Sequence, residues 1–360
     1  MKGKTGNKGE WSEIYVLLKL LSEGKLYAAD SDLNKLEDIF YPIMTIFREE
    51  MSGTTNYNIA ENINKIRITD NSGKEIICLP MEQFKSNSEK LLEEIKKKHD
   101  KAGHTFSCPS LENFLTSINC NTVAKGGGEK KDIEMQVHDM RTGKNPKLGF
   151  SIKSLLGKNS TLFNPGKNTN FKYLIQGIKN IDTTEINKGK PESVINYIKN
   201  NEGQLKFDEV CDKNFNSNLI LIDSNMPEIL AEMLRYKYFI GKSKIKDIIT
   251  EMVKNNPLKF PDSEHPFYQY KIKNFLTDAA LGMTPGKKWT GEYNATGGII
   301  IVKKDGDILC YHIYNRNEFQ NYLFNNTKLE QASSGRYDFG KIYTENGKAF
   351  INLNLQIRFT

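Results

Sequence analysis

The stretch KKDIEMQVHDMRTGKNPKLGFSIKS, residues 130–154, carries the pattern on which the fold depends. Residues 132–137 and 148–154 are two short segments with strand-like patterns. The residues between them are rich in turn formers. The stretch therefore predicts a β-hairpin, and the polar side chains of each strand can be assigned to a face.

Two acids and a lysine occupy this hairpin. Residues two apart on a strand share a face, so Asp132 lies with Glu134. Ser151 lies with Lys153 for the same reason. Hydrolysis of a phosphodiester needs a divalent ion to acidify a water, and a cation near the attacking hydroxide. Asp132 and the carbonyl of Ile152 offer the oxygen ligands that Mg²⁺ prefers, and Lys153 is placed to activate the nucleophile.

The same hairpin has a second interpretation, as an ordinary surface element. In that case Asp132 and Lys153 form a solvated ion pair without any chemistry. A metal site of this kind usually has a second acid two residues before the lysine, and Ser151 occupies that position. Spacing alone leaves both interpretations open.

The bulk composition sets the broad class. The chain has 360 residues, which is long enough for two domains, with 26% charged and 38% hydrophobic residues, as in globular proteins. Its formal net charge of +7 favours a polyanionic partner such as nucleic acid. A composition rich in Lys, Asn and Ile accounts for that charge equally well.

Several classes of protein are disfavoured. Five scattered cysteines without CxxC spacing predict free thiols in a reducing cytoplasm, rather than a zinc site or disulfides. The five histidines form no HExxH pair, which argues against a zinc hydrolase. No apolar run approaches the roughly 18 residues of a membrane span. The basic N-terminus leads into a helix with glutamates, unlike a signal peptide.

The chain changes character along its length. EWSEIYVLLKLL, residues 10–21, predicts an amphipathic helix. Helical patterns dominate from residue 171 to about 255, with a strand-like run at residues 219–223. GGIIIVKKDGDILCYHIY, residues 297–314, predicts a hairpin, and residues 349–359 predict a last strand. The sum is a mixed α/β first half, a helical middle and a β-rich end.

Over nearly its full length the chain resembles the HpaII-like family of type II restriction endonucleases, within the PD-(D/E)xK nuclease superfamily. The resemblance rests on stretches that occur in the expected order: KGEWSEIYVLLKLL, GGGEKKDIEMQVHD, LGFSIKSLLG, STLFNPGKNTNF, ASSGRYDFG and NLNLQIRF.

The resemblance implies a fold and an activity. The fold class is α/β, or mixed α+β, with a mixed sheet flanked by helices as its core. Residues 1–175 would form the nuclease core, residues 176–258 a mainly helical segment, and residues 259–360 a β-rich part for DNA recognition. The activity would be Mg²⁺-dependent cleavage of a short palindrome, which is C-C-G-G for the family's namesake.

By position, the resemblance makes Asp132 the metal ligand and Lys153 the catalytic lysine. Ser151 departs from the superfamily pattern, which has Asp or Glu there. Some S-x-K enzymes carry the replacement acid on the following helix. In this chain the first acids after Lys153 are Asp182 and Glu185, which lie too far along.

Two other positions offer the second carboxylate. Glu134 shares a strand face with Asp132. Glu13 lies on the first predicted helix, which often lends a glutamate to the metal site in this superfamily. Glu10, one turn earlier, ranks behind these two, and solvation on a polar helix face is the alternative interpretation for both helix residues.

The segment after the hairpin predicts a DNA contact, because its amides, hydroxyls and lysines can bond to base edges and phosphates. An Asn-rich surface loop is the alternative. The candidates are Lys158, Asn159, Ser160, Thr161, Asn164, Lys167, Asn168, Thr169 and Asn170. Near the C-terminus, Arg336 is a candidate guanine reader and Ser333 and Ser334 are candidate phosphate contacts, whereas Arg358 fits a structural ion pair equally well.

The expected partners follow from this interpretation. They are double-stranded DNA, a second copy of the chain in a symmetric homodimer, and a cognate DNA methyltransferase, with Mg²⁺ as cofactor. One rival is a DNA-binding protein that keeps the fold without cleavage, which Ser151 makes worth testing. A second rival is an enzyme that acts on RNA or single strands, but the aromatic residues do not gather into a stacking platform.

Overall fold

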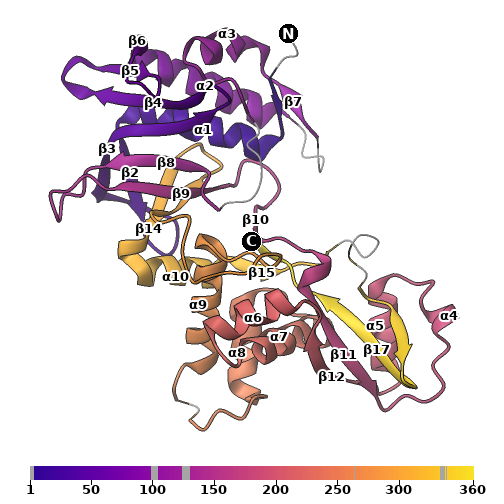
Figure 1. Ribbon diagram of the computed structural model, residues 1–360. Helices are drawn as coiled ribbons and strands as arrows, with labels where there is room; N and C mark the ends of the chain where they lie inside the picture. Colours follow the sequence, from indigo (N-terminus) through magenta and orange to yellow (C-terminus); the bar gives the residue numbers. More distant parts are fainter. Residues whose placement is uncertain (1–3, 99–103, 124–129, 263, 333–336, 338) are drawn as a thin grey trace. The chain divides into compact units, whose positions relative to one another are not determined.

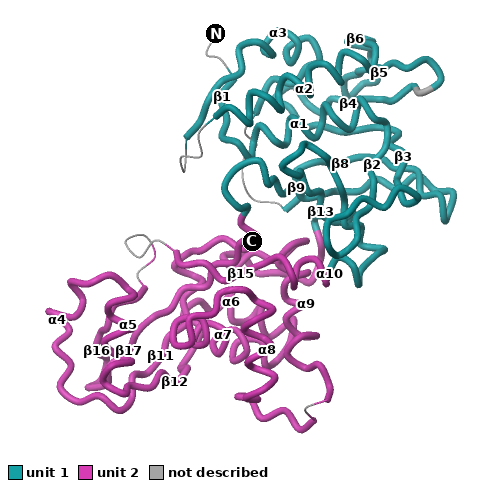
Figure 2. Tube along the Cα trace, turned by 180° about the vertical axis from the view of Figure 1, so that it is seen from behind, with its two compact units in different colours: residues 1–160, 294–319 teal, residues 161–293, 320–360 magenta. Residues whose placement is uncertain are grey.

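The structure is a computed structural model, which describes residues 4–98, 104–123, 130–262, 264–332, 337 and 339–360. The chain divides into two compact units (Figure 2). Unit 1 contains Met1–Ser160 and Asn294–Phe319, and unit 2 contains Thr161–Tyr293 and Gln320–Thr360. The division therefore does not follow three consecutive parts of the chain, because a late segment returns to the first unit to complete its sheet.

Unit 1 is built on one large sheet (Figure 1). Its described strands are β2 (Lys25–Ala29), β3 (Lys35–Glu50), β4 (Gly53–Ala60), β5 (Lys65–Thr69), β6 (Glu75–Pro80), β8 (Ile133–Val137), β9 (Lys147–Ser154), β13 (Gly298–Val302) and β14 (Ile308–His312). Their order is β2-β14-β13-β9-β8-β3-β4-β5-β6. Since β2 also pairs with β3, the first six strands in this order close into a ring.

The predicted hairpin is confirmed and lies inside this sheet. β8 and β9 are antiparallel, with Glu134 opposite Gly149. On its other edge β9 pairs in parallel with β13, which places Lys153 beside Ile301. β13 and β14 are the predicted second hairpin, and they are antiparallel. The sheet is thus mixed, and the strand that carries Lys153 has a neighbour on each side.

Helix α1 (Lys8–Glu23) covers the apolar side of the hairpin. Asn7 and Glu10 form a capping box at its start, and Gly24 ends it with a φ of 69°. Its apolar face shares one core with Ile133 and Phe150 of the hairpin. Unit 1 also contains α2 (Met81–Lys97), α3 (Pro109–Ser117) and a small pair of strands, β1 (Thr5–Gly6) and β7 (Phe106–Ser107).

Unit 2 has two antiparallel sheets and a group of helices. One sheet has the order β12 (Gln204–Val210), β11 (Asn170–Gln176), β17 (Lys348–Asn354), β16 (Ile342–Glu345), and the other has β10 (Thr161–Phe163), β18 (Ile357–Phe359), β15 (Thr327–Leu329). The helices are α4 (Thr183–Ile186), α5 (Pro191–Asn200), α6 (Lys213–Ile222), α7 (Met226–Ile240), α8 (Ile245–Asn255) and α9 (Phe267–Leu281), and α10 (Arg316–Asn325) runs from the end of unit 1 into unit 2.

Three local predictions need correction. The run at residues 219–223 is not a strand but the end of α6, whose start is capped by Asp212. A short apolar run has no periodicity that separates a strand from a buried helix. The middle segment is not helical throughout, because β11 and β12 lie within it. The last strand pattern is two strands, β17 and β18, which belong to different sheets.

Two further expectations can be compared with the fold. All five cysteines are free thiols, three of them buried, as their spacing predicts. Within the described residues, no helix has both the length and the apolar character needed to cross a membrane.

His312, at the end of β14, gives unit 1 a pH-sensitive element. It is 1% exposed, its ring stacks on Tyr41 with centroids 4.6 Å apart, and its Nδ1 accepts a hydrogen bond from the Tyr314 backbone N. Burial lowers the pKa of His312 to about 4, while Asp139 and Arg141 act in opposite directions. A pKa lowered by folding stabilises the protein fully above the unfolded pKa, near 6.5, and this stability is lost as the pH falls toward 4.

We therefore expect the free energy of unfolding to fall by about 2 kcal/mol between about pH 8 and pH 5 through His312 alone. His312→Phe keeps a ring between Tyr41 and Phe150 but removes the titrating nitrogen. Urea unfolding at the two pH values measures the effect, and the variant should lose less stability on acidification than the parent. An equal loss in both proteins would assign the pH dependence to other groups.

Candidate functional site

The site is assembled on the polar face of the hairpin. In an antiparallel pair, residues opposite each other share a face, so the register extends Glu134 and Gly149 to Asp132 and Ser151. The Asp132 backbone N donates to the Phe150 carbonyl at 2.9 Å and prolongs the ladder by one residue beyond β8. Asp132 and Ser151 are thus held side by side by backbone pairing.

A chain of hydrogen bonds joins Asp132 to Lys153. The Lys153 Nζ donates to the Ser151 Oγ at 2.8 Å, and this hydroxyl donates to the Asp132 Oδ2 at 3.1 Å. The Ile152 backbone N donates to the same carboxylate oxygen at 2.6 Å. Ser151 is 0% exposed and links the acid to the lysine. Since a hydroxyl both donates and accepts, Ser151 orients both groups without adding a third charge.

Glu134 shares the face but is engaged by other groups. The Lys131 Nζ lies 2.9 Å from its Oε1, and the Lys147 Nζ lies 2.6 Å from its Oε2. Although partial burial acts to raise it, the hydrogen bonds from Lys147 and Lys131 hold the pKa of Glu134 below its ordinary value. Gly149 makes this possible, because a Cβ there would approach the Lys131 Cδ to 2.6 Å. Glu134 is ionised, with a lysine on each oxygen.

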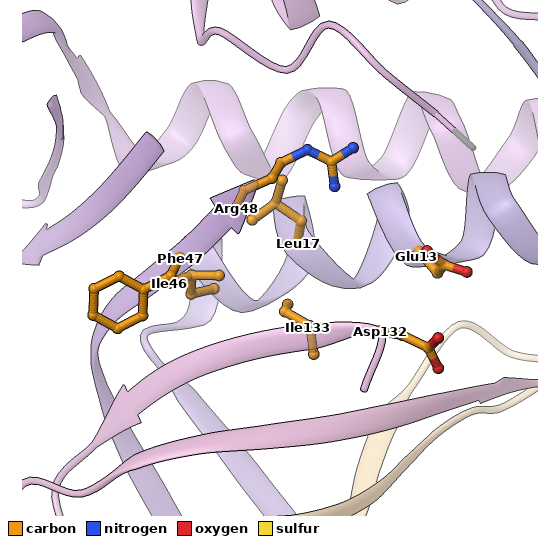
Figure 3. A pocket seen from close by; sticks show the side chains of 7 residues that line it. All are labelled: Glu13, Leu17, Ile46, Phe47, Arg48, Asp132 and Ile133. Atoms are coloured by element: carbon orange, nitrogen blue, oxygen red, sulfur yellow. The ribbon is translucent and has the colours of Figure 1, made fainter. Parts of the chain in front are cut away.

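The two helix glutamates differ in what they do. Glu10 belongs to the capping box, where its Oε2 accepts from the Asn7 backbone N at 2.7 Å. Glu13, one turn later, lines a small cavity of about 10 Å³ together with Asp132. Figure 3 shows Glu13 on α1 and Asp132 at the start of the hairpin strand, at the same end of this cavity. Of the two helix glutamates, Glu13 thus lines a cavity with Asp132, whereas Glu10 caps the helix.

The cavity wall contains a buried charge that is balanced by its own partner. Arg48, which is 4% exposed, lines the cavity, and its Nε lies 2.7 Å from the Glu50 Oε1. The Arg48 guanidinium also donates to the Thr122 carbonyl. Because its charge is satisfied locally, Arg48 supports the wall of the cavity.

Lys130 is a second lysine near the pair, and sequence reasoning missed it. Burial, together with the positive charge of Lys153, lowers the pKa of Lys130 to about 8, against the opposing effect of Asp132. Two lysines do precede Asp132 in the sequence. The alternation of side chains along β8 assigns faces only to residues of the strand, so it could not place Lys130 near the site. The site therefore contains a second lysine, Lys130, besides the Lys153 that the spacing from Asp132 predicts.

The candidate DNA contacts in unit 1 lie directly after β9. Lys158 is exposed, and Asn159 and Ser160 are partly exposed. The Ser160 Oγ donates to the Ser154 carbonyl at 2.7 Å, so this residue fixes the turn of the chain that leaves the site.

The candidates in unit 2 divide into outward and inward residues. Asn164 and Lys167 are exposed and Thr161 and Asn168 are partly exposed. Thr169 and Asn170 are 0% and 3% exposed. The Thr169 Oγ1 donates to the Gly166 carbonyl at 3.0 Å, and the Asn170 Nδ2 donates to the Tyr337 carbonyl at 2.8 Å.

Thr169 and Asn170 therefore hold the loop from inside, and this structure does not present them to DNA as the sequence predicted. The Asn354 Nδ2 bonds to both the Gly166 carbonyl and the Asn170 Oδ1, at 2.7 Å each. Arg358 lies on β18 opposite Thr161. Ser333, Ser334 and Arg336 lie outside the described residues.

The unit 1 site combines a carboxylate oriented by a backbone N–H, a lysine linked to it through a hydroxyl, and a second carboxylate at a shared cavity. These are the groups that a hydrolase of phosphodiesters employs. The family model of the HpaII restriction endonuclease matches residues 7–359. The type II restriction enzyme HpaII of Haemophilus parainfluenzae is 44% identical over 358 residues, 99% of this chain and 98% of that enzyme. No solved structure matches the chain.

The chain belongs to the HpaII restriction endonuclease family. It is a type II restriction enzyme, that is, a site-specific deoxyribonuclease. The resemblance drawn from the sequence stretches is therefore confirmed, and so is the mixed α/β class.

Proposed function

We propose that this enzyme cuts both strands of a short palindrome with Mg²⁺, and that the site is C-C-G-G. The observation that carries the chemistry is the chain of bonds from Lys153 through Ser151 to Asp132, with Glu13 at the same cavity. The proposed target rests on the similarity to HpaII over nearly the whole of both chains.

The donor set fits a hard divalent cation. Asp132 and Glu13, which line one cavity, would supply carboxylate oxygens, and the carbonyl of Ile152 would supply a neutral oxygen. Among the described residues, no three His, Cys, Asp or Glu side chains gather into a metal-binding group. A site with two carboxylates and one carbonyl suits Mg²⁺, which keeps several water ligands in proteins. Bound there, Mg²⁺ would polarise the phosphoryl oxygen and acidify a water.

The side chains of the chain have separate roles in the proposed reaction. A water attacks the phosphorus in line, the bond to the 3′ oxygen breaks, and the products carry a 5′-phosphate and a 3′-hydroxyl. Lys153 positions the attacking water and stabilises the charge that develops on the phosphoryl oxygens. Ser151 holds the Lys153 ammonium toward Asp132, and the Ile152 N–H keeps the carboxylate oriented.

The fold around this site is consistent with a PD-(D/E)xK core. The acid and the lysine lie on the antiparallel pair β8 and β9, β13 continues the sheet in parallel, and α1 covers the other face. We assign Ser151 the role of orienting Lys153 and Asp132. We assign Glu13 the role of the acid that the superfamily pattern has at the position of Ser151. Glu134, which forms ion pairs with Lys131 and Lys147, shapes the rim of the site.

The remaining partners follow from the proposed target. A two-fold symmetric DNA site favours a symmetric homodimer in which each subunit cuts one strand. A cognate DNA methyltransferase would protect the host's own sites, and the enzyme would act in the cytoplasm. The outward residues of the segment after β9 are the proposed DNA contacts in this chain, namely Lys158, Asn159, Thr161, Asn164, Lys167 and Asn168.

A plasmid digestion with end mapping tests the proposal. We expect discrete fragments in Mg²⁺, intact plasmid when the metal is chelated, and 5′-phosphate ends that map within C-C-G-G. Random fragments, or discrete cutting that persists without a divalent ion, would contradict it. Site-specific binding with intact plasmid at every metal concentration would identify a DNA-binding protein instead.

A further inference from the structure

Unit 1 has a large basic hollow beside the site. Its volume is about 450 Å³, and it is lined by Lys8, Lys96, Lys98, Leu155, Leu156, Gly157 and Lys304. The four lysines come from three different places in the chain, and none of the lining residues is acidic. We call these residues the basic hollow.

The hollow lies where α1 begins, where α2 ends and where β13 turns into β14. Lys8 is the first residue of α1, Lys96 and Lys98 lie at the end of α2, and Lys304 lies in the turn between β13 and β14. The Lys8 Nζ donates to the Leu156 carbonyl at 3.3 Å, and the Lys96 Nζ donates to the Asp305 carbonyl at 3.2 Å. Backbone carbonyls thus orient two ammonium groups at the rim of the hollow.

The acids next to Lys98 and Lys304 in the described part of the chain interact with the hollow only weakly or point to other lysines. Glu94 approaches Lys98 to 3.8 Å, which is a long pair on a helix surface and weak in water. The Asp305 carboxylate lies 3.1 Å from Lys303, which does not line the hollow. Lys96 and Lys304 are exposed. A cluster of hydrated ammonium groups around a hollow attracts phosphate, the most abundant anion on the substrate of this enzyme.

Along two separate elements, the hollow is only a few residues away from the proposed catalytic groups. Leu155 follows Lys153 by two residues, which is about 7 Å of extended chain. Lys8 precedes Glu13 by five residues, which is about 7.5 Å along a helix. The Ser12 Oγ donates to the Ser154 Oγ at 2.8 Å and ties the two elements together. One DNA strand carries a phosphate about every 3.4 Å of axis, so both steps correspond to one or two nucleotides.

We infer that the basic hollow binds the DNA backbone one or two nucleotides from the scissile phosphate, which rests on the proposed nuclease function. The contact is with phosphate oxygens and is independent of the bases. It holds the strand in register with Asp132 and Lys153, so that the hollow contributes to binding and to the position of the cut strand.

The test compares two matched double variants. Lys98→Gln with Lys304→Gln removes two charges from the hollow. Lys97→Gln with Lys303→Gln removes the neighbouring two, which lie on the same elements and pair with Glu93 and Asp305. The DNA is a duplex with one central site. The slope of log K for binding against log salt concentration changes by about 0.9 for each phosphate contact, so we expect the first variant to reduce the magnitude of this slope by about 2. The loss of DNA affinity in this variant, relative to the parent, should be about tenfold larger at about 50 mM salt than at about 200 mM salt. The control should keep the slope of the parent.

Neutral methylphosphonates placed singly near the cut position locate the contact. In the parent, a methylphosphonate one or two nucleotides from the cut should weaken binding, and in the hollow variant it should add no further loss. Equal slopes in the two variants, or full additivity with the methylphosphonates, would overturn the inference. A parent protein that shows neither cleavage nor site-specific binding would instead overturn the proposed function, so the two failures are distinct.

Discussion

Asp132→Ala and Lys153→Ala each lower the rate of cleavage by at least about 10²-fold, while binding to the target persists. The Ile152 N–H and the Ser151 hydroxyl both orient the Asp132 carboxylate, so its loss would remove the proposed metal ligand. In the proposed mechanism Lys153 supplies the positive charge beside the reacting phosphate, and a lost donor of this kind costs about 10²–10³ in rate. Single-turnover cleavage measures the rate, and fluorescence anisotropy with chelated metal measures binding.

Lys147→Ala is the matched control for Lys153→Ala, because both lysines lie on β9. Lys147 pairs with Glu134 at 2.6 Å rather than with the Asp132 group. We expect the control to keep cleavage within about tenfold of the parent, since exposed ion pairs contribute about 1 kcal/mol or less. Asp132→Asn keeps the volume and an acceptor for the Ile152 N–H, so its inactivity would show that the charge matters. Cleavage by either alanine variant at the parent rate would remove the residue from the site.

Glu13→Gln lowers cleavage by about 10²-fold or more, whereas Glu134→Gln changes it by less than about tenfold. The reason is placement: Glu13 lines the cavity with Asp132, and Glu134 has a lysine on each oxygen. Loss of a metal ligand removes several kcal/mol of transition-state stabilisation. The informative measurement is the Mg²⁺ dependence of the rate, because Glu13→Gln should raise the Mg²⁺ concentration for half-maximal cleavage.

Glu10→Ala separates the role of the helix from the role of the metal site. Glu10 completes the capping box of α1, so this variant should lose about 1 kcal/mol of stability and leave the Mg²⁺ dependence unchanged. If Glu134→Gln shifts the Mg²⁺ dependence and Glu13→Gln does not, the second carboxylate belongs to the strand.

The hairpin and the first helix were predictable because their information is local. Alternation places Asp132, Ser151 and Lys153 on strands, and the pleat then assigns their faces. The apolar stripe of residues 10–21 specifies α1 in the same way. The full-length resemblance added the nature of the reaction, which no short pattern carries.

Other features depend on contacts between distant parts of the chain. The β13 strand pairs in parallel with β9 from a position more than 140 residues later, and local pattern cannot choose that neighbour. Polar residues in one loop look alike in sequence, yet Thr169 and Asn170 are buried while Asn164 faces solvent. The lysines of the basic hollow come from three separate places in the chain, so no single stretch of sequence contains it.

The residues alone placed Asp132 and Lys153 on one hairpin, since the geometry of a hairpin is set by its own backbone, and the family resemblance made them the proposed acid and lysine of the reaction. They left the partner of that acid open between Glu134 and Glu13. The folded chain gives the two different surroundings, because Glu13 on α1 lines a small cavity with Asp132, while Gly149 lets Lys131 lie across the strand onto Glu134. These surroundings are the reason for proposing Glu13 as the second carboxylate. A carboxylate's role depends on which charges reach it, and that is a property of the folded chain.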